Sequence, residues 1–212
     1  MIKINEIFYS IQGESTRAGI PTVFVRTSGC PLRCNFCDTE YAFTEGSKMS
    51  LDDIVSKVAE FRSDYVCVTG GEPLVQKEVF ELMNRLCDMG LKVSVETSGA
   101  YSCEPIDKRV KKIVDIKTPG SGEGKSSLLD NLEFLSSDDE LKFVITSHDD
   151  FDWTVDFVEK YRLTDKCTVL ISPNHKAIDY KWLAESVLTR LPKVRLQLQM
   201  HKFIWPEQER GV

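Results

Sequence analysis

The chain has 212 residues, of which 42% are hydrophobic and 28% charged, a composition that can build a core and excludes a disordered or fibrous protein. Its 33 acidic residues outnumber the 27 basic ones, and the net charge of -6 disfavours nonspecific binding to nucleic acid or to anionic membranes. No apolar run approaches the length of a membrane span, and residues 1–15 lack the pattern of a signal peptide. We therefore expect a cytoplasmic protein that forms a single domain over residues 1–212 and acts on small molecules.

Short apolar runs rich in Val, Ile and Phe recur along the chain and alternate with segments of helical period. Runs of this kind are typical of strands that are buried on both faces, as in a parallel sheet. The predicted strands, in chain order, are residues 21–26, 65–68, 91–95, 112–116, 141–145, 168–171 and 194–198.

Helices are predicted between these strands. Ser50 is placed to cap the first, over residues 51–61, and Asp53 completes a capping box with it. Residues 75–89 show the clearest 3.6-residue period, and Gly90 follows them where a left-handed residue ends a helix. Three further segments are predicted to be helical: residues 127–135, 150–161 and 179–191.

The alternation of strand and helix predicts right-handed βαβ units around a parallel sheet. About six parallel strands are too few for the eight of a closed barrel. We therefore expect an α/β protein with a partial, open TIM-like (βα) barrel, whose chemistry gathers at the carboxyl ends of the strands.

Three of the seven cysteines, Cys30, Cys34 and Cys37, follow the first predicted strand. An odd and clustered set fits poorly with a secreted disulfide framework and better with a metal site in a reducing compartment. Thiols at this spacing can hold three irons of a four-iron cluster and leave the fourth iron open to an external ligand. A zinc site completed by a fourth Cys or His is the alternative, although the other cysteines stand singly and the histidines form no paired pattern.

Two glycine-rich stretches stand out. The sequence Thr-Gly-Gly-Glu-Pro at residues 69–73 follows the second predicted strand, where glycines let a ligand approach the backbone and backbone groups can bind an ammonium. The sequence Gly-Glu-Gly-Lys-Ser at residues 122–126 is similar to a phosphate-binding loop, but Pro119 stands where that pattern requires glycine. We interpret it as a flexible loop and exclude a nucleotide triphosphatase.

The cysteine spacing after a first strand, followed by Gly-Gly-Glu-Pro, resembles the radical S-adenosylmethionine (SAM) superfamily. This resemblance implies a radical SAM core with a [4Fe–4S] cluster on the three clustered cysteines. It also implies SAM as a cofactor, its amino group bound by the segment of Gly70, Gly71 and Glu72.

Further segments, from residue 6 nearly to the C-terminus, resemble the 7-carboxy-7-deazaguanine synthase family. They are Ser-Ile-Gln-Gly-Glu at residues 10–14, Asp-Thr at 38–39 and Gln-Met-His-Lys-Phe at 199–203. In this resemblance Thr39 is a ligand of Mg2+ and Arg26 meets the substrate carboxylate. The implied substrate-binding residues are Ile11, Gln12, Gly13, Glu14, Arg26, Thr69 and His201. The implied cofactor-binding residues are Phe36, Asp38, Gly70, Gly71, Glu72, Thr97, Ser98, Lys117, Thr118, Ser172 and Asn174. The segment 115–119 departs from the Ser-Pro-Lys of many members, and residues 172–174 also differ from the corresponding adenosine-contacting turn.

The resemblance implies a lyase that converts 6-carboxy-5,6,7,8-tetrahydropterin to 7-carboxy-7-deazaguanine, with release of ammonia, in 7-deazapurine (queuosine) biosynthesis. A 5′-deoxyadenosyl radical takes a hydrogen atom from C6 of the pterin, and SAM is re-formed at the end. We hypothesise that Glu14 or His201 assists a later proton transfer as a catalytic residue. The implied partners are an electron donor, such as flavodoxin or ferredoxin, and a second copy in a homodimer.

Two other functions remain as alternatives. A glycyl-radical-enzyme activase shares the cysteine loop and the small size but needs a broad surface for its partner. A noncatalytic iron–sulfur or zinc module has no need of the segment 70–73 and does not bind SAM.

Overall fold

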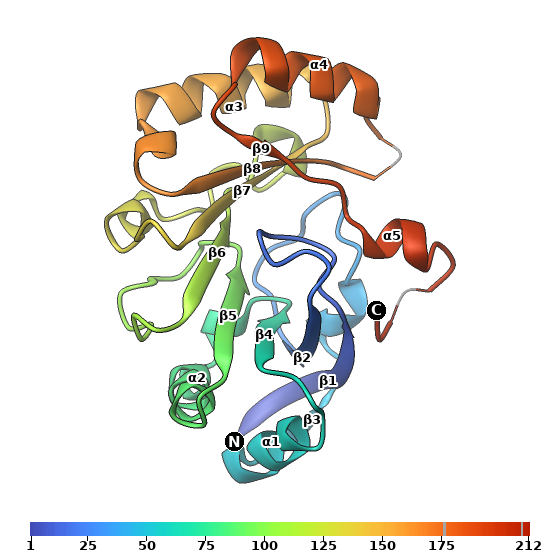
Figure 1. Cartoon of the computed structure of the whole chain (residues 1–212), viewed down its shortest axis with the longest axis vertical. Coiled ribbons are helices and arrows are strands. Elements are labelled where there is room, and N and C mark those ends of the chain that lie inside the picture. The colour runs from blue at the N-terminus through green and yellow to red at the C-terminus, as the bar shows by residue number, and fades with distance from the viewer. Residues whose placement is uncertain (176, 209) are drawn as a thin grey trace.

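The computed structural model describes residues 1–175, 177–208 and 210–212. Within these residues nine strands form one sheet, in the order β3-β1-β2-β4-β5-β6-β7-β8-β9. All neighbours from β2 to β9 pair in parallel, whereas β1 pairs antiparallel with both β2 and β3. The sheet curves into an open barrel with α1 to α4 on its outside (Figure 1), which confirms the predicted partial TIM-like barrel.

The strands are β1 Ile2–Ile11, β2 Pro21–Thr27, β3 Ser47–Met49, β4 Tyr65–Gly70, β5 Lys92–Thr97, β6 Lys111–Asp115, β7 Glu140–Ile145, β8 Thr168–Pro173 and β9 Arg195–Leu196. The α-helices are α1 Leu51–Ala59, α2 Glu78–Asp88, α3 His148–Lys160, α4 Tyr180–Arg190 and α5 His201–Ile204. Short 3-10 helices cover Glu40–Phe43, Pro73–Val75, Pro119–Ser121, Leu129–Glu133 and Leu163–Asp165. Among the described residues no helix is both long and apolar enough to span a bilayer.

The predicted start of α1 and the predicted glycine after α2 are confirmed. The Ser50 side chain accepts a hydrogen bond from Asp53 N, and Asp53 reciprocates at the Ser50 backbone, so the capping box is complete. Gly90 has a φ of 81° after α2, as a left-handed terminating residue requires. The helix itself starts at Glu78, later than predicted, because Pro73–Val75 forms a separate 3-10 turn.

Two sequence predictions of secondary structure were wrong, and two strands were missed. Residues 127–135 form only the 3-10 helix Leu129–Glu133, because Leu128 and Leu129 stay exposed and the Asn131 amide bonds to Gly99 O and Tyr101 O. The last strand is Arg195–Leu196 rather than residues 194–198. The antiparallel strands β1 and β3 were not predicted, since most of the outer side of β1 stays partly exposed and its pattern resembles no buried strand.

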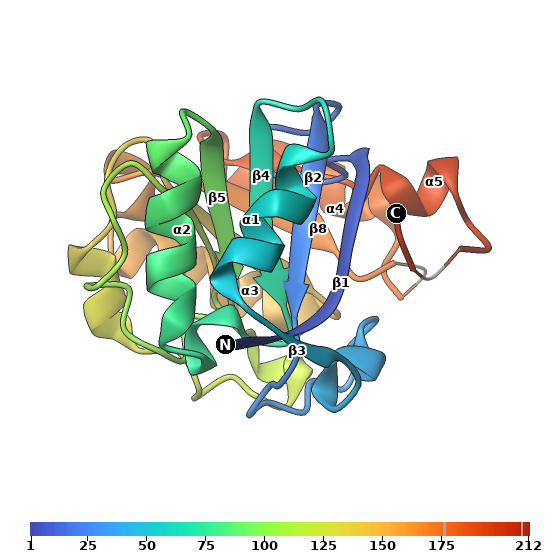
Figure 2. The ribbon, with the colours of Figure 1, turned by 90° about the horizontal axis from the view of Figure 1, so that it is seen from below.

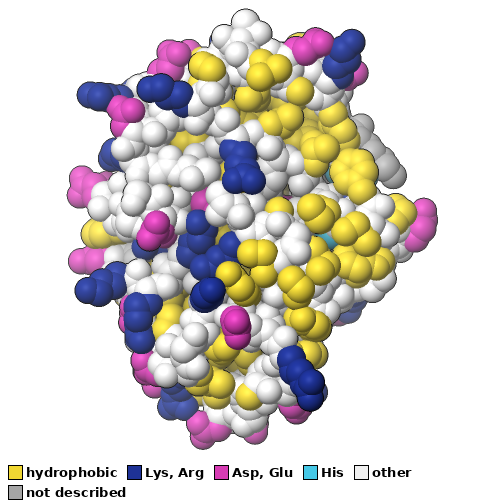
Figure 3. All heavy atoms as spheres, viewed as in Figure 1, with side chains coloured by type: hydrophobic (Ala, Val, Ile, Leu, Met, Phe, Trp, Pro, Cys, Tyr) yellow, Lys and Arg dark blue, Asp and Glu magenta, His cyan; other side chains and the backbone are white. Residues whose placement is uncertain are grey.

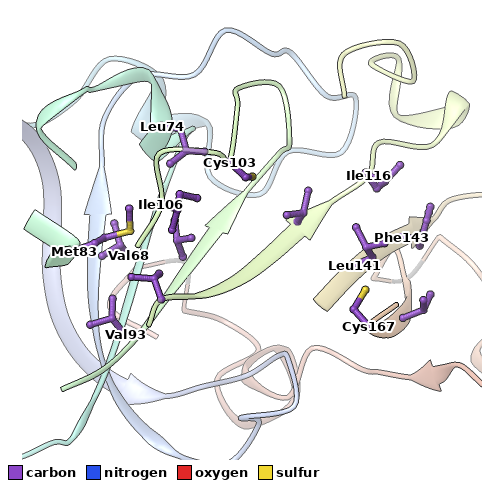
Figure 4. Packing of buried hydrophobic residues seen from close by; sticks show 14 of the residues in the cluster. Val68, Leu74, Met83, Val93, Cys103, Ile106, Ile116, Leu141, Phe143 and Cys167 are labelled. Carbon is purple, nitrogen blue, oxygen red and sulfur yellow. The ribbon is translucent and has the colours of Figure 1, made fainter. Parts of the chain in front are cut away.

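The hydrophobic core lies between the sheet and the helices outside it. Figure 4 shows Met83 of α2 close to Val68 and Val93 of the sheet, and Phe143 in a second group beside Cys167. These side chains are almost completely buried, and each large one contributes about 1.5–3 kcal/mol relative to an exposed position. Alternate residues of the same strands therefore point to the inside of the barrel, where the site lies.

Candidate active site

A cavity of about 430 Å³ opens at the carboxyl ends of the parallel strands. Its wall is formed by the ends of β2, β4, β5, β6 and β7, by the loops that follow them, and by the segments around residues 11–14 and 199–202. In Figure 3, Lys and Arg side chains gather at the centre of the face that looks into the ring of strands. The volume suits a small ligand, and the lining carries both acidic and basic side chains, which suits a ligand with polar groups of both kinds.

The fold brings most of the predicted site residues to this cavity. The lining includes Ile11, Gln12, Gly13, Glu14, Arg26, Cys30, Cys34, Phe36, Cys37, Asp38, Thr39, Thr69, Gly70, Gly71, Thr97, Ser98, Lys117, Asn174 and His201. Three of the predicted residues are not part of the lining. They are Glu72, Thr118 and Ser172, each at most 1% exposed.

The cysteine loop after β2 is fixed to the glycine loop after β4. Glu72 N donates to Gly29 O at 2.8 Å, and Gly71 N donates to Thr27 O at 3.2 Å. Gly71 lies so close to the cysteine loop that an added Cβ would be 2.5 Å from Gly29 O and 2.8 Å from Cys30 Cβ. The two sequence motifs therefore form one structural unit. Glycine is required at position 71 because any side chain there would collide with the cysteine loop, and not because of its backbone conformation.

The three clustered thiols are half-buried and line the same cavity. Burial raises the pKa of each of them, so binding of a metal centre at neutral pH must displace their protons. A single zinc ion needs its thiolates about 2.3 Å from one centre. Across the ranges that the structure covers, no three His, Cys, Asp or Glu side chains are placed to hold one ion. In a four-iron cluster each thiolate would instead bind a different iron.

Glu72 acts inside the protein rather than at the cavity surface. Its carboxylate accepts hydrogen bonds from Leu74 N at 3.0 Å, Ser98 N at 2.8 Å and Thr97 Oγ1 at 2.8 Å. A fully buried carboxylate needs several donors, and these come from both the glycine loop and the loop after β5. Glu72 thus holds together two loops that line the cavity, and it leaves Gly70 and Gly71 as the exposed backbone that can contact a ligand.

Glu14 is placed in the cavity by the loop that follows β1. The loop is anchored where Ser15 N donates to Gln197 Oε1 at 2.8 Å and Thr16 N donates to Glu140 Oε1 at 3.0 Å. Ser15 has a φ of 66°, an uncommon conformation for a residue other than glycine, and it turns the chain inward here. The dark blue loop inside the ring of strands in Figure 1 is this segment.

Three side chains meet at Glu14. Lys142 of β7 donates to Glu14 Oε2 in a short ion pair, and Gln199 Nε2 donates to Glu14 Oε1 at 2.6 Å. The Gln12 side chain accepts from Glu14 N at 3.1 Å. Burial by itself raises the pKa of Glu14, but the Lys142 ammonium overcomes this effect and holds the pKa below its ordinary value. Glu14 is therefore a fixed carboxylate at neutral pH.

The pKa values of Glu96 and His201, which also line the cavity, are shifted toward the neutral forms. Burial, assisted by the charge of Glu14, raises the pKa of Glu96, which accepts hydrogen bonds from Gln12 Nε2 at 3.3 Å and Thr69 Oγ1 at 3.2 Å. Burial lowers the pKa of His201, so its imidazole is neutral at neutral pH. The His201 ring packs against the Gly13 backbone, where an added Cβ would be 2.2 Å from Nδ1.

Arg26 lies at the end of β2, with its side chain only 14% exposed. Its Nε donates to Glu6 Oε1 at 2.8 Å, and its guanidinium carbon lies 5.5 Å from the Phe8 ring centre and 5.9 Å from that of Tyr41. The guanidinium is therefore held on one edge and stacked against rings, an arrangement that fixes its direction toward the cavity.

Lys142 lines the cavity and was not predicted from the sequence; Glu96, Asp115 and Gln199 also line it, and they lie in predicted site segments without having been assigned a role themselves. Lys117 Nζ lies 3.0 Å from Asp115 Oδ2, and Lys142 Nζ lies 4.0 Å from the same oxygen. The available signal was a polar residue within or at the end of each apolar strand. The contacts of Lys142 and Gln199 with Glu14 could not be recognised, because these residues are far apart in the chain.

An open barrel with three cysteines after β2 and a glycine loop after β4 has the architecture of a radical SAM enzyme, and the family model of the Radical SAM superfamily matches residues 24–172. The curated 7-carboxy-7-deazaguanine synthase of Koribacter versatilis (strain Ellin345) is 42% identical over 226 residues, which cover 100% of both chains. That of Chlorobaculum tepidum is 41% identical over 215 residues, which cover 100% of this chain and 97% of the relative. The chain belongs to the 7-carboxy-7-deazaguanine synthase family.

Solved structures share the fold. A crystal structure of QueE from Escherichia coli superposes with a TM-score of 0.79 at 22% identity and covers 94% of each chain. Streptococcus suis SuiB bound to a precursor peptide has a TM-score of 0.61 at 13% identity, over 87% of this chain and 50% of SuiB. The relatives that match along the whole chain are synthases, so the activase alternative is not supported.

Proposed function

We propose that this chain converts 6-carboxy-5,6,7,8-tetrahydropterin to 7-carboxy-7-deazaguanine and releases ammonia, as its family membership implies. One observation supports this function most strongly: a single cavity is lined both by the three cysteines and by the Gln12 and Glu14 side chains. A heterocycle that binds to Gln12 and Glu14 would therefore lie in the same cavity as the cluster and its bound SAM. When bound, the reduced cluster supplies the electron that cleaves SAM and so provides the hydrogen-abstracting radical.

The chain's own residues bind and orient the pterin in this proposal. The Glu14 carboxylate, kept ionised by Lys142, accepts hydrogen bonds from the ring N–H groups at the 2-amino-4-oxo end. At the other end Arg26 meets the substrate carboxylate with its terminal nitrogens, since its Nε is already used by Glu6. Two fixed charges of opposite sign therefore set the direction of the ring, which is the protein's main contribution to such chemistry.

A magnesium ion would bind at Thr39 in the same proposal. Thr39 lines the cavity, and its Oγ1 donates to Asp38 Oδ1 at 2.9 Å. Partial desolvation raises the pKa of Asp38, whose side chain is 50% exposed, but Lys202, whose Nζ is 2.9 Å from Asp38 Oδ2, lowers it to about 2. Magnesium suits a site with few protein oxygens and several waters or substrate oxygens, and Thr39 offers such an oxygen beside an ionised carboxylate.

A later proton transfer would be assisted by Glu14 or His201. The low pKa of Glu14 makes it a weak base, whereas a neutral imidazole has a proton affinity closer to what general base catalysis requires. The structure therefore favours His201 over Glu14 for this step. If His201→Ala and Glu14→Gln lost only substrate affinity and kept full turnover, neither residue would have the role.

The expected partners complete the proposal. We infer an electron donor such as flavodoxin or ferredoxin, a cytoplasmic location and a homodimer. Exposed apolar side chains around α5 support the homodimer, because such a patch on a protein surface marks an interface. They are Leu198, Met200, Phe203 and Ile204, in the region where Figure 3 shows hydrophobic side chains beside α5.

Anaerobic turnover tests the proposed function. Reconstituted, dithionite-reduced protein is supplied with SAM, Mg2+ and 6-carboxytetrahydropterin, and the products are read by mass spectrometry. We expect 7-carboxy-7-deazaguanine with the parent protein and none with Cys34→Ala, because that variant lacks a cluster ligand. Cys87→Ala is the matched control, since Cys87 lies on α2 outside the cavity. SAM cleavage without this product would contradict the proposed substrate and return attention to the activase.

A further inference from the structure

The loop that follows β6 lies against the cysteine loop at the carboxyl end of the sheet, and Figure 2 shows both loops at the same end of the molecule. It contains the stretch 122–126, whose sequence is similar to a phosphate-binding loop but lacks the glycine that such a loop requires. We refer to residues 118–123 as the clamp loop. The contacts of the clamp loop indicate a structural role beside the cysteine loop rather than phosphate binding.

The clamp loop holds the two residues on either side of one cysteine. Arg33 N donates to Glu123 Oε1 at 2.7 Å, and Asn35 N donates to Ser121 O at 2.9 Å. Cys34 stands between these two residues, so its backbone is fixed from both sides by the same loop. The first bond involves an ionisable carboxylate, and such bonds are stronger than those between neutral groups.

The Asn35 side chain adds a third contact. Its Nδ2 donates to Gly120 O at 3.3 Å, and its amide lies directly against Gly122, where an added Cβ would be 3.1 Å from Asn35 Oδ1. Gly122 also has a φ of 80°, so glycine at this position serves both the turn and the close approach. The clamp loop is thus shaped to fit the segment 33–35.

The clamp loop is itself anchored in the core of the protein. Gly120 N donates to Asp150 Oδ1 at 2.8 Å, and Asp150, which is 2% exposed, also accepts from Thr146 N at 3.2 Å. Thr118 Oγ1 donates to Val144 O at 3.1 Å. These bonds join residues 118–120 of the clamp loop to the end of β7 and to the first turn of α3, so the loop is anchored to the body of the protein.

We propose that the clamp loop positions Cys34 as a cluster ligand, and that Glu123 and Asp150 are positioning residues for the [4Fe–4S] cluster. Glu123 binds the backbone of Arg33, and Ser121 binds the backbone of Asn35, so both act on Cys34 through its neighbours in the chain. Neither the clamp loop nor Asp150 needs to contact the cluster itself. The proposal depends on the cluster alone and is independent of which substrate the enzyme takes. A loop that keeps one thiolate in place slows the loss of iron from a cluster that has only three protein ligands.

The test measures the rate at which the reconstituted holoenzyme loses iron to bathophenanthroline disulfonate under anaerobic conditions. We expect Glu123→Ala to lose iron about tenfold faster than the parent, roughly the effect of one lost hydrogen bond to a charged group. Glu123→Gln keeps an acceptor oxygen and should return the rate close to the parent value. Lys125→Ala is the matched control, since Lys125 is an exposed residue two positions after the clamp loop. Iron loss from Glu123→Ala at the parent rate, or equally fast from the Gln variant or the control, would overturn the proposal.

A second pair of variants separates positioning from general stability. Asp150→Ala should also accelerate iron loss, whereas Asp149→Ala, on the exposed side of the same turn, should not. The melting temperature of the cluster-free protein and the EPR spectrum of the reduced cluster are recorded for each variant. Positioning predicts that Glu123→Ala changes the iron-loss rate and the EPR spectrum while the melting temperature stays unchanged. Faster iron loss that only follows a lower melting temperature would show a merely structural role, and the proposal would be wrong.

Discussion

Lys142→Met is expected to lower kcat/KM for the pterin by about 100-fold or more, and to lower the free energy of unfolding by about 3 kcal/mol or more. Lys142 and Glu14 form an ion pair in which each side chain is only 13% exposed. Removal of the ammonium leaves Glu14 as a buried carboxylate without its cation, next to Glu96. We expect the pKa of Glu14 to rise as a result, so that its carboxylate binds the substrate less strongly.

The pH dependence of this variant follows from the pKa of Glu14. In the parent protein that pKa lies below the ordinary value of 4.5, so the ion pair stabilises the fold above about pH 4.5 and is lost as the pH falls through the folded value. In Lys142→Met the lowering effect of the ammonium is lost, and we expect burial to raise the same pKa. We therefore expect the difference in unfolding free energy between the two proteins to be largest at neutral pH and to shrink as the pH falls. The acid limb of the kcat/KM profile should move to higher pH.

Denaturant unfolding across a pH series, with a double-mutant cycle, measures this effect. In a Glu14→Gln background Lys142→Met should cost much less than it does in the parent, because no buried carboxylate is left without a partner. Lys166→Met removes an exposed lysine and serves as the control for loss of a charge alone. A penalty that is the same in both backgrounds, or one that does not change with pH, would contradict the role of Lys142.

Gly71→Ala is expected to yield a folded protein that retains almost no iron and does not cleave SAM. The added methyl group would lie 2.5 Å from Gly29 O and 2.8 Å from Cys30 Cβ, distances that real Cβ atoms do not reach. Backbone rather than a flexible side chain stands in the way, so the cysteine loop must move to accommodate the methyl group. The first cysteine is thereby displaced from the position in which it binds iron.

Iron content per chain and the visible absorbance of the cluster after reconstitution check this result. Gly90→Ala is the matched control: Gly90 has a φ of 81° and open space around it, so its substitution should cost about 1 kcal/mol of stability and leave the cluster intact. A Gly71→Ala protein with the iron content of the parent would show that the two loops are not coupled as the structure indicates.

Features of the fold that depend on residues close together in the chain could be predicted from the sequence. The buried parallel strands and the capping box at Ser50 were recognised from residues that lie a few positions apart. The cysteine loop and the glycine loop could be assigned in the same way, because each is one continuous segment after a strand. That they touch, with Glu72 N bonded to Gly29 O, follows only from the parallel pairing of β2 with β4.

The remainder of the site depends on residues that are distant in the chain. Lys142 meets Glu14 across 128 positions, and Gln199 meets it across 185, so no local pattern connects them. The stretch 122–126 is predicted to be a flexible loop, but Glu123 within it accepts from Arg33 N across 90 positions, a contact that no local pattern indicates. The antiparallel β1 was missed for a related reason, since its pairing with β2 is what makes it a strand.

The central claim is that this cavity performs radical hydrogen abstraction on the pterin, and a deuterium label at C6 of the substrate tests it most directly. The labelled pterin is turned over anaerobically with a limiting amount of SAM, and the recovered SAM is analysed by mass spectrometry. We predict that deuterium appears on the 5′ carbon of SAM in the parent protein and not in Cys34→Ala. Formation of 7-carboxy-7-deazaguanine without any deuterium in SAM would contradict the account, because hydrogen would then leave C6 by a route that does not involve the cofactor.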